Sequence, residues 1–136
     1  MSSLTGFMEF LQENGIHIDE SADVRVMSKG IILNGRKWYA QDYGLFRKID
    51  QTLWLGRVKH FVYVHQNDSY SVFARVYTYE CEGSADNLNF VYCVDLTGSP
   101  LCYVPMQNFR SMAVVTPHWT DNSLACAIMV DPVFLT

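Results

Sequence analysis

The sequence feature that most constrains the fold is a succession of short hydrophobic runs, each bounded by residues that favour turns. The runs are rich in Val, Tyr and Phe, and they are separated by Gly, Pro, Asn, Asp and Ser. Runs this short indicate strands, because a helix needs a longer stretch with a 3.6-residue period. After extended structure near Val24, the expected strands lie within Gly30–Ala40, Leu55–His65, Tyr70–Tyr79, Phe90–Val94, Leu101–Val104, Met112–Thr116 and Leu124–Val130.

One segment has helical spacing instead. Leu4–Asn14 places Phe7, Phe10 and Leu11 on one side, and Gly15 follows as a helix stop. We expect this apolar stripe to dock on the chain's own sheet, and docking on a partner is the alternative.

The predicted fold class is therefore all-β: a small barrel or twisted sandwich of seven or eight short strands with one short N-terminal helix. A chain of 136 residues is long enough for one domain. We expect an N-terminal helix and acidic connector in residues 1–22 and a single β domain in residues 23–136.

Turn chemistry predicts two hairpins. Asn34 and Gly35 join two β-favouring runs, and this pair accepts the positive φ angles of a tight type I′ turn. A second, polar turn at Gln66–Ser69 joins Leu55–His65 to Tyr70–Tyr79.

Alternation along the second hairpin assigns its side chains to two faces. One face is apolar and is expected to be core: Val58, His60, Val62, Val64, Tyr70, Val72, Ala74 and Val76. The other face mixes rings with cations and is the candidate platform for a partner: Arg57, Lys59, Phe61, Tyr63, Phe73, Arg75, Tyr77 and Tyr79. Such a face is either an exposed binding platform or a second buried layer under other strands.

A second candidate site is an aromatic cage for a methylated lysine. A cage holds the cation against ring faces within about 6 Å, and aromatic residues make up 14% of this chain. The candidate members are Trp38, Tyr39, Tyr43 and Trp54, with Asp42 as the acid.

Charge is unevenly distributed, although the net charge is only −4. Every Lys and Arg except Arg110 lies between Arg25 and Arg75, and residues 1–24 hold acids without a base. The basic segment can steer an acidic partner, or it can pair with the acidic flanks in the folded chain. A pI of about 5.4 disfavours nucleic acid as the main ligand. We expect a protein or peptide partner, and an acidic segment is a candidate.

No catalytic or metal-binding pattern stands out in the sequence. Cys81, Cys93, Cys102 and Cys126 form no C-x-x-C pair, so they lack zinc-site spacing, and we expect half-buried thiols that serve as small core residues rather than disulfides. The P-loop, G-x-S-x-G and H-E-x-x-H motifs are absent. We therefore expect a non-enzymatic protein without a metal or cofactor.

The first residues carry neither a basic start nor an apolar run of signal-peptide length, and no run of membrane-spanning length follows. This pattern predicts a nuclear or cytoplasmic protein that is not secreted and does not bind a membrane.

Three segments follow one another in a recognisable order. Asn34–Tyr43 holds a turn, a tyrosine and an aspartate that opens a strand, Trp54–Val58 is an apolar-Gly-Arg-apolar strand, and Val72–Tyr79 is a strand that ends in aromatics. Together they resemble a bromo-adjacent homology (BAH) domain, a β-rich module of chromatin-associated proteins, although Gln41 stands where members carry a glycine. The segments are also similar to proteins derived from transposable elements.

The resemblance implies a protein-interaction module that binds a protein segment in a chromatin-associated or transposon-derived assembly. It also makes a histone tail a candidate partner. The alternative from another class is an intracellular β-barrel that binds a small apolar ligand, because 49% of the residues are hydrophobic.

Overall fold

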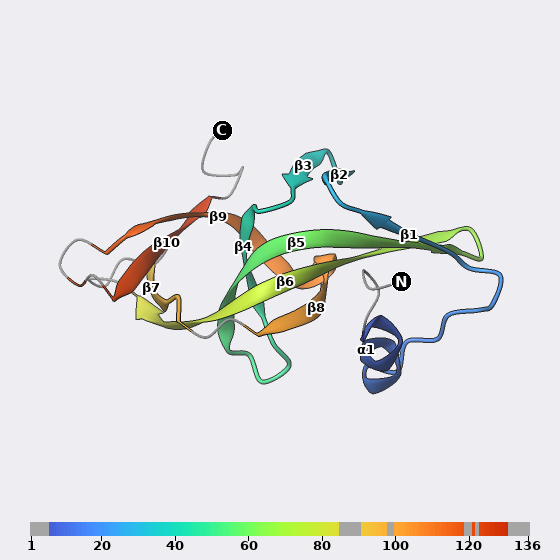
Figure 1. Ribbon diagram of the computed structural model, residues 1–136, viewed down its shortest axis with the longest axis horizontal. Coiled ribbons are helices and arrows are strands. Elements are labelled where there is room, and N and C mark those ends of the chain that lie inside the picture. Colours follow the sequence, from blue (N-terminus) through green and yellow to red (C-terminus); the bar gives the residue numbers. More distant parts are fainter. Residues whose placement is uncertain (1–5, 85–90, 98–99, 119–120, 122, 131–136) are drawn as a thin grey trace.

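The computed structural model describes residues 6–84, 91–97, 100–118, 121 and 123–130 (Figure 1). Leu4 and Phe90, which begin two of the expected elements, lie outside these residues. Most of the chain is strand and the helix is short, which confirms the predicted all-β class. The elements are α1 Phe7–Glu13, β1 Asp23–Met27, β2 Gly30–Leu33, β3 Arg36–Tyr39, β4 Tyr43–Arg47, β5 Leu53–Gln66, β6 Ser69–Ser84, β7 Val91–Asp95, β8 Leu101–Pro105, the 3-10 turn η3 Met106–Asn108, β9 Phe109–Pro117 and β10 Leu124–Val130.

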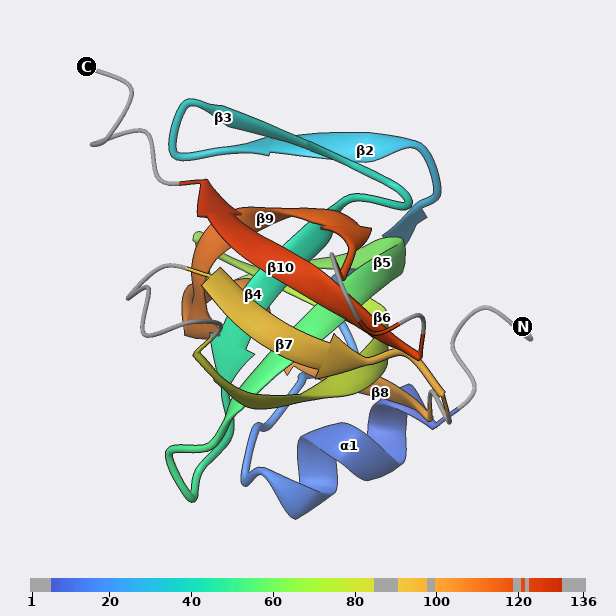
Figure 2. The same ribbon diagram turned by 90° about the vertical axis from the view of Figure 1, so that its left-hand side faces the viewer.

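Eight of the strands form one antiparallel sheet that partly closes on itself. Its order is β1-β5-β4-β9-β10-β7-β6-β8, and β5 also pairs with β6. This additional pairing joins β5, β4, β9, β10, β7 and β6 into a six-stranded ring, seen in Figure 2. The predicted small barrel is therefore present, while β2 and β3 form a separate two-stranded sheet.

The strand count differs from the expected seven or eight, because the described residues hold ten strands. β4 was not expected from the hydrophobic runs, and β5 and β6 are long, at 14 and 16 residues. Each long strand has two successive partners on its outer edge. β4 pairs with Leu53–Arg57 of β5 and β1 with Phe61–His65, while β7 and β8 share β6 in the same way. β5 and β6 together form one long hairpin. The half that pairs with β4 and β7 belongs to the ring, and the half next to the β5–β6 turn projects beyond it (Figure 1).

A β-bulge interrupts the alternation of β5. Val58 pairs with Val76 and His60 with Arg75, so Lys59 is an extra residue in this strand. Because one inserted residue shifts the period by one, Val58 and Phe61 lie on the same side and are buried in the same cluster. The prediction that Val58, His60, Val62 and Val64 share one face is therefore wrong.

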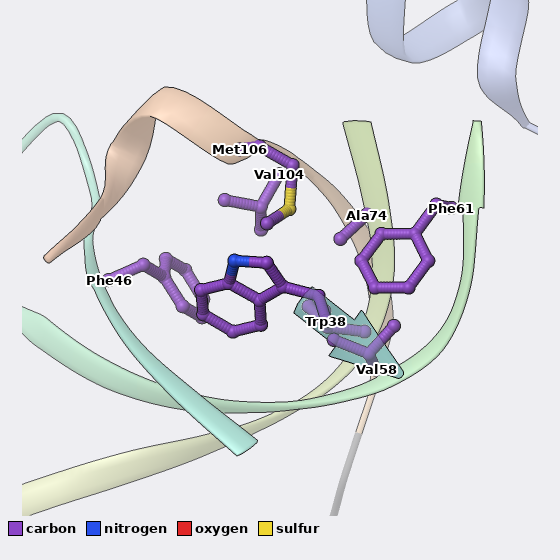
Figure 3. Close-up of a cluster of buried hydrophobic side chains, with 8 residues drawn as sticks. Trp38, Phe46, Val58, Phe61, Ala74, Val104 and Met106 are labelled. Carbon is purple, nitrogen blue, oxygen red and sulfur yellow. The ribbon is translucent and has the colours of Figure 1, made fainter. Parts of the chain in front are cut away.

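The described residues form three large hydrophobic cores and a small cluster around Cys126. The ring interior is packed with buried residues from five of its strands: Leu45, Leu55, Tyr79, Val94 and Ala127. A second core lies between the long hairpin and the β2–β3 sheet, with Trp38 at its centre (Figure 3): Trp38, Phe46, Val58, Phe61, Ala74, Val76, Val104 and Met106. The third core lies on the opposite face of the projecting hairpin, under α1: Phe7, Leu11, Val62, Val64, Phe73 and Tyr103.

The N-terminal helix docks on the chain's own sheet, as expected. Phe7 and Leu11 are each only 1% exposed, and Phe10 packs beside them. The ring of Phe7 meets the edge of Phe73 at 5.4 Å and lies 5.1 Å from that of Tyr103. The apolar stripe of α1 thus covers β5, β6 and β8.

Three turns in the described chain are closed by an aspartate followed two positions later by a threonine or serine. Asp50, Asp95 and Asp121 each accept hydrogen bonds from both the backbone and the hydroxyl of that residue. These bonds favour the ionised carboxylate and lower the pKa of all three aspartates.

The two predicted hairpin turns both have the type I′ backbone. Asn34 and Gly35 have φ angles of 52° and 78°, and Asn67 and Asp68 have 52° and 59°.

Gly35→Val is expected to lower the free energy of unfolding by about 1–2 kcal/mol, because a β-branched residue is strained at positive φ. Asp68→Gly at the equivalent turn position is expected to raise it by up to about 1 kcal/mol. Urea denaturation of the two variants measures both effects, and shifts in the same direction would contradict this account of the turns.

Candidate functional site

The predicted aromatic and basic platform does not form a single surface. Arg57 lies on the interior face of the ring, where it is the Cα partner of Tyr77 and Tyr43. Its guanidinium carbon lies 4.4 Å from the centre of the Tyr77 ring, and it donates a hydrogen bond to Gln41. The Tyr79 hydroxyl beside it raises the pKa of the guanidinium above its ordinary value.

The other platform residues are divided by the bulge and by α1. Lys59 is exposed at the bulge, and Phe61 is fully buried in the second core, around Trp38. Phe73 is buried under α1, and the guanidinium of Arg75 lies 5.4 Å from the ring of Tyr103. The structure therefore favours the alternative of a buried second layer for most of this set, and Tyr63 alone borders the groove described below.

The aromatic cage residues are not brought together either. Trp38 is 5% exposed and points into the second core, whereas its neighbour Tyr39 points to the opposite side and is 55% exposed. Tyr43 packs at the ring interior, and Trp54 packs against the second core with the Lys48 ammonium 3.5 Å from its ring. Asp42 accepts a hydrogen bond of 2.7 Å from the backbone N–H of Tyr39 and so holds the turn before β4. The predicted cage is not formed, because Trp38 and Trp54 pack at the second core, Tyr43 packs at the ring interior and Tyr39 faces solvent.

A groove that was not predicted runs along the β2–β3 sheet and the end of β1. It consists of two adjoining hollows, which share Met27, Ile31 and Ile32. The hollow of about 560 Å³ lies between this sheet and the projecting half of the long hairpin, while the hollow of about 440 Å³ is lined by residues 27–39 alone. A third hollow of about 420 Å³ continues it past Tyr70. We call the first two hollows the inter-hairpin groove, and its lining residues are Arg25, Met27, Lys29, Gly30, Ile31, Ile32, Leu33, Lys37, Tyr39, Tyr63, Tyr70 and Val72.

Several large apolar side chains in this groove are open to solvent. Ile32 is 70% exposed, Tyr70 is 64% exposed, and Met27 and Tyr39 are 40% and 55% exposed. These residues lie close together along one depression, whereas isolated surface hydrophobics are ordinary. The clustering marks this surface as a binding site candidate.

The far end of the groove is aromatic. The rings of Tyr63 and Tyr70 lie 5.4 Å apart, and the His65 ring stacks on Tyr70 at 4.4 Å. These three residues share one face because the turn at Asn67 and Asp68 pairs His65 with Tyr70 and Tyr63 with Val72. Partial burial, followed by the neighbouring Tyr70, raises the pKa of the Tyr63 phenol, so this hydroxyl is neutral at neutral pH.

The charged residues that line the groove are all basic. Arg25, Lys29 and Lys37 are exposed there, and no acid is among the described lining residues. Arg25 pairs with Asp23 at 3.0 Å, whereas Lys29 and Lys37 form no ion pair within the part of the chain that the structure describes. The groove therefore combines apolar contact area with uncompensated positive charge.

Another hollow, of about 610 Å³, lies between α1 and the β4–β5 turn. Its charged lining residues have both signs, Glu13 and Asp50 beside Arg47 and Lys48. This balance selects for no charge in a ligand, so the inter-hairpin groove is the stronger candidate.

The described residues contain neither a candidate metal site nor a helix that could span a membrane. No group of three His, Cys, Asp or Glu side chains among them could hold a metal ion. None of the helices found in these ranges has both the length and the apolar character needed to cross a bilayer.

Sequence reasoning missed the groove because its walls come from segments that are distant along the chain. β1, the β2–β3 hairpin and the tip of the β5–β6 hairpin each contribute side chains. The only sequence signal was the basic middle segment, which contains Arg25, Lys29 and Lys37.

Comparison with known proteins adds no family assignment. No protein-family model matches the chain, and searches of curated proteins and of solved structures found no significant match.

Proposed function

We propose that the chain is a non-enzymatic interaction module whose inter-hairpin groove binds an acidic protein segment with a large apolar side chain. The observation that carries this proposal is that exposed Met27, Ile32 and Tyr70 line one groove with Lys29 and Lys37, which form no ion pair with any described residue. The ring interior is filled by Leu45, Leu55 and other buried side chains, so this part of the fold does not favour the alternative of an enclosed ligand.

The two kinds of residue have separate roles in the proposed complex. Burying exposed apolar area contributes about 25 cal/mol per Å², so an aromatic or aliphatic anchor against Ile32 and Tyr70 supplies most of the affinity. Lys29 and Lys37 attract carboxylates, orient the segment and raise the association rate.

The cellular setting of this proposal rests on the resemblance to BAH domains. We propose a partner protein in a chromatin-associated or transposon-derived assembly, in the nucleus or the cytoplasm. A histone tail is basic for most of its length, so the charge of the groove favours an acidic segment over it.

Selection from a random peptide library displayed on phage tests the proposal without assuming a partner. The bait is the full chain, and the matched bait is the Lys29→Glu, Lys37→Glu double variant. We expect the full chain to enrich peptides that hold several acids beside an aromatic or aliphatic residue, and the variant bait to lose them. Enrichment of basic or uncharged peptides, or no enrichment at all, would contradict the proposal.

A further inference from the structure

Two cysteines lie directly opposite each other on neighbouring strands of the ring. Cys93 in β7 and Cys126 in β10 are Cα partners in the antiparallel register. Their neighbours Val94 and Ala127 point into the ring, so both cysteines point to its outer face. There the side chain of Cys93 packs against that of Cys126.

This placement meets the backbone requirement of a disulfide. Directly opposed residues of an antiparallel pair have Cα atoms about 4.5 or 5.5 Å apart, and disulfides span Cα separations of about 4.4–6.8 Å. The pairing therefore places the two Cα atoms within the range of separations that a disulfide spans. The other two cysteines have no such partner, because Cys81 is opposite Val94 and Cys102 is opposite Val76.

The two thiols also differ in access. Cys93 is half-buried and Cys126 is 1% exposed, so an oxidant in solution reaches Cys93 first. Burial raises the pKa of Cys81 to about 12 and also raises that of Cys102, which leaves little reactive thiolate at neutral pH in those two residues.

We propose that Cys93 and Cys126, which are thiols in the structure, form a redox site that takes a hydroperoxide as oxidant and closes an intrachain disulfide. The Cys93 thiolate attacks the peroxide, its sulfur gains an oxygen to become a sulfenic acid, and with hydrogen peroxide the leaving hydroxide is released as water. The Cys126 sulfur then attacks the sulfenic sulfur, the S–S bond forms, and a second water leaves. The thiols lose two electrons in total, and the O–O bond of the peroxide accepts them.

The disulfide would clamp β7 to β10 at the end of the ring away from the inter-hairpin groove (Figure 1). Cross-linking two strands that are distant in sequence restricts the unfolded chain and stabilises the fold. The proposal is thus independent of the proposed function, and either can fail alone.

The test treats the reduced full chain with one equivalent of hydrogen peroxide and then blocks remaining thiols with N-ethylmaleimide. We expect an intact mass lower by two hydrogen atoms before blocking, two fewer maleimides per chain, and a Cys93–Cys126 linked peptide in the proteolytic map. The melting temperature should rise by roughly 5–10 °C and return after reduction with dithiothreitol.

Single cysteine-to-alanine variants identify which two residues form the cross-link. Cys93→Ala and Cys126→Ala should abolish the cross-link, while Cys81→Ala and Cys102→Ala should retain it. The peptide map of the unmutated chain decides the pairing even if a variant fails to fold. A linked peptide from any other pair, a disulfide only between two chains, or oxygen addition at Cys93 without a cross-link would overturn the proposal.

Discussion

Trp38→Ala is expected to lower the free energy of unfolding by about 3–5 kcal/mol. Trp38 is 5% exposed and packs among Phe46, Val58 and Met106 in the second core (Figure 3), so its removal leaves a large cavity. The loss is a substantial fraction of the roughly 5–15 kcal/mol that stabilises an ordinary domain.

The Trp38→Ala variant should also disturb the inter-hairpin groove. β2 and β3 pair only with each other among the described strands, so Trp38, with Ile31 and Leu33, holds this small sheet against the long hairpin. Chemical denaturation of the variant measures the loss. Tyr39→Ala is the matched control on the same strand, because Tyr39 is 55% exposed, and we expect it to change stability by less than about 0.5 kcal/mol. Equal effects of the two variants would contradict the described packing.

Charge reversal in the groove is expected to weaken peptide binding by roughly 10- to 100-fold. Lys29→Glu with Lys37→Glu replaces two cations that line the groove by anions, and these repel an acidic segment. Both residues are exposed, so the fold should survive. The measurement is the dissociation constant of a fluorescent peptide from the display selection, at two salt concentrations.

The matched control reverses two lysines outside the groove. Lys48→Glu with Lys59→Glu changes the net charge by the same amount, and both residues are exposed. We expect this variant to bind within about threefold of the unmodified chain, because neither lysine lines the groove and salt weakens the effect of exposed charges outside the contact. A loss of affinity equal to that of the groove variant would show that binding responds only to overall charge.

The local elements of the fold were predictable because short-range chemistry determines them. The Asn34-Gly35 turn, the polar turn that includes Asn67 and the helical spacing of Phe7 and Leu11 each depend on residues close together in sequence. β4 was missed, since its short run contains Gly44, a residue that disfavours strands. In the structure β4 is stabilised by pairing with β5 and β9, which a local pattern does not reveal.

The bulge explains why the predicted platform failed. Period-two alternation was correct for β6, where Arg75, Tyr77 and Tyr79 share a face. On β5 the extra residue Lys59 turned Phe61 into the second core, and nothing in the local sequence marks that insertion. One inserted residue reverses every side chain after it, so the aromatic and basic face was divided between different cores.

The inter-hairpin groove could not be predicted from the sequence because it, too, depends on contacts between distant segments. The positive charge of the inter-hairpin groove was evident from the basic middle segment of the sequence. The shape of the groove, however, depends on where packing in the second core places the β2–β3 sheet. Tertiary packing therefore decides which of the basic residues meet exposed apolar side chains.

The most direct test of the binding-module account is an amide chemical-shift map of the ¹⁵N-labelled full chain during titration with a selected acidic peptide. We predict shift changes concentrated at Met27, Ile32, Lys37 and Tyr70, with Val94 in the ring unaffected. Changes centred on Arg57 in the ring, or on the hollow beside α1, would contradict the assignment of function to the inter-hairpin groove.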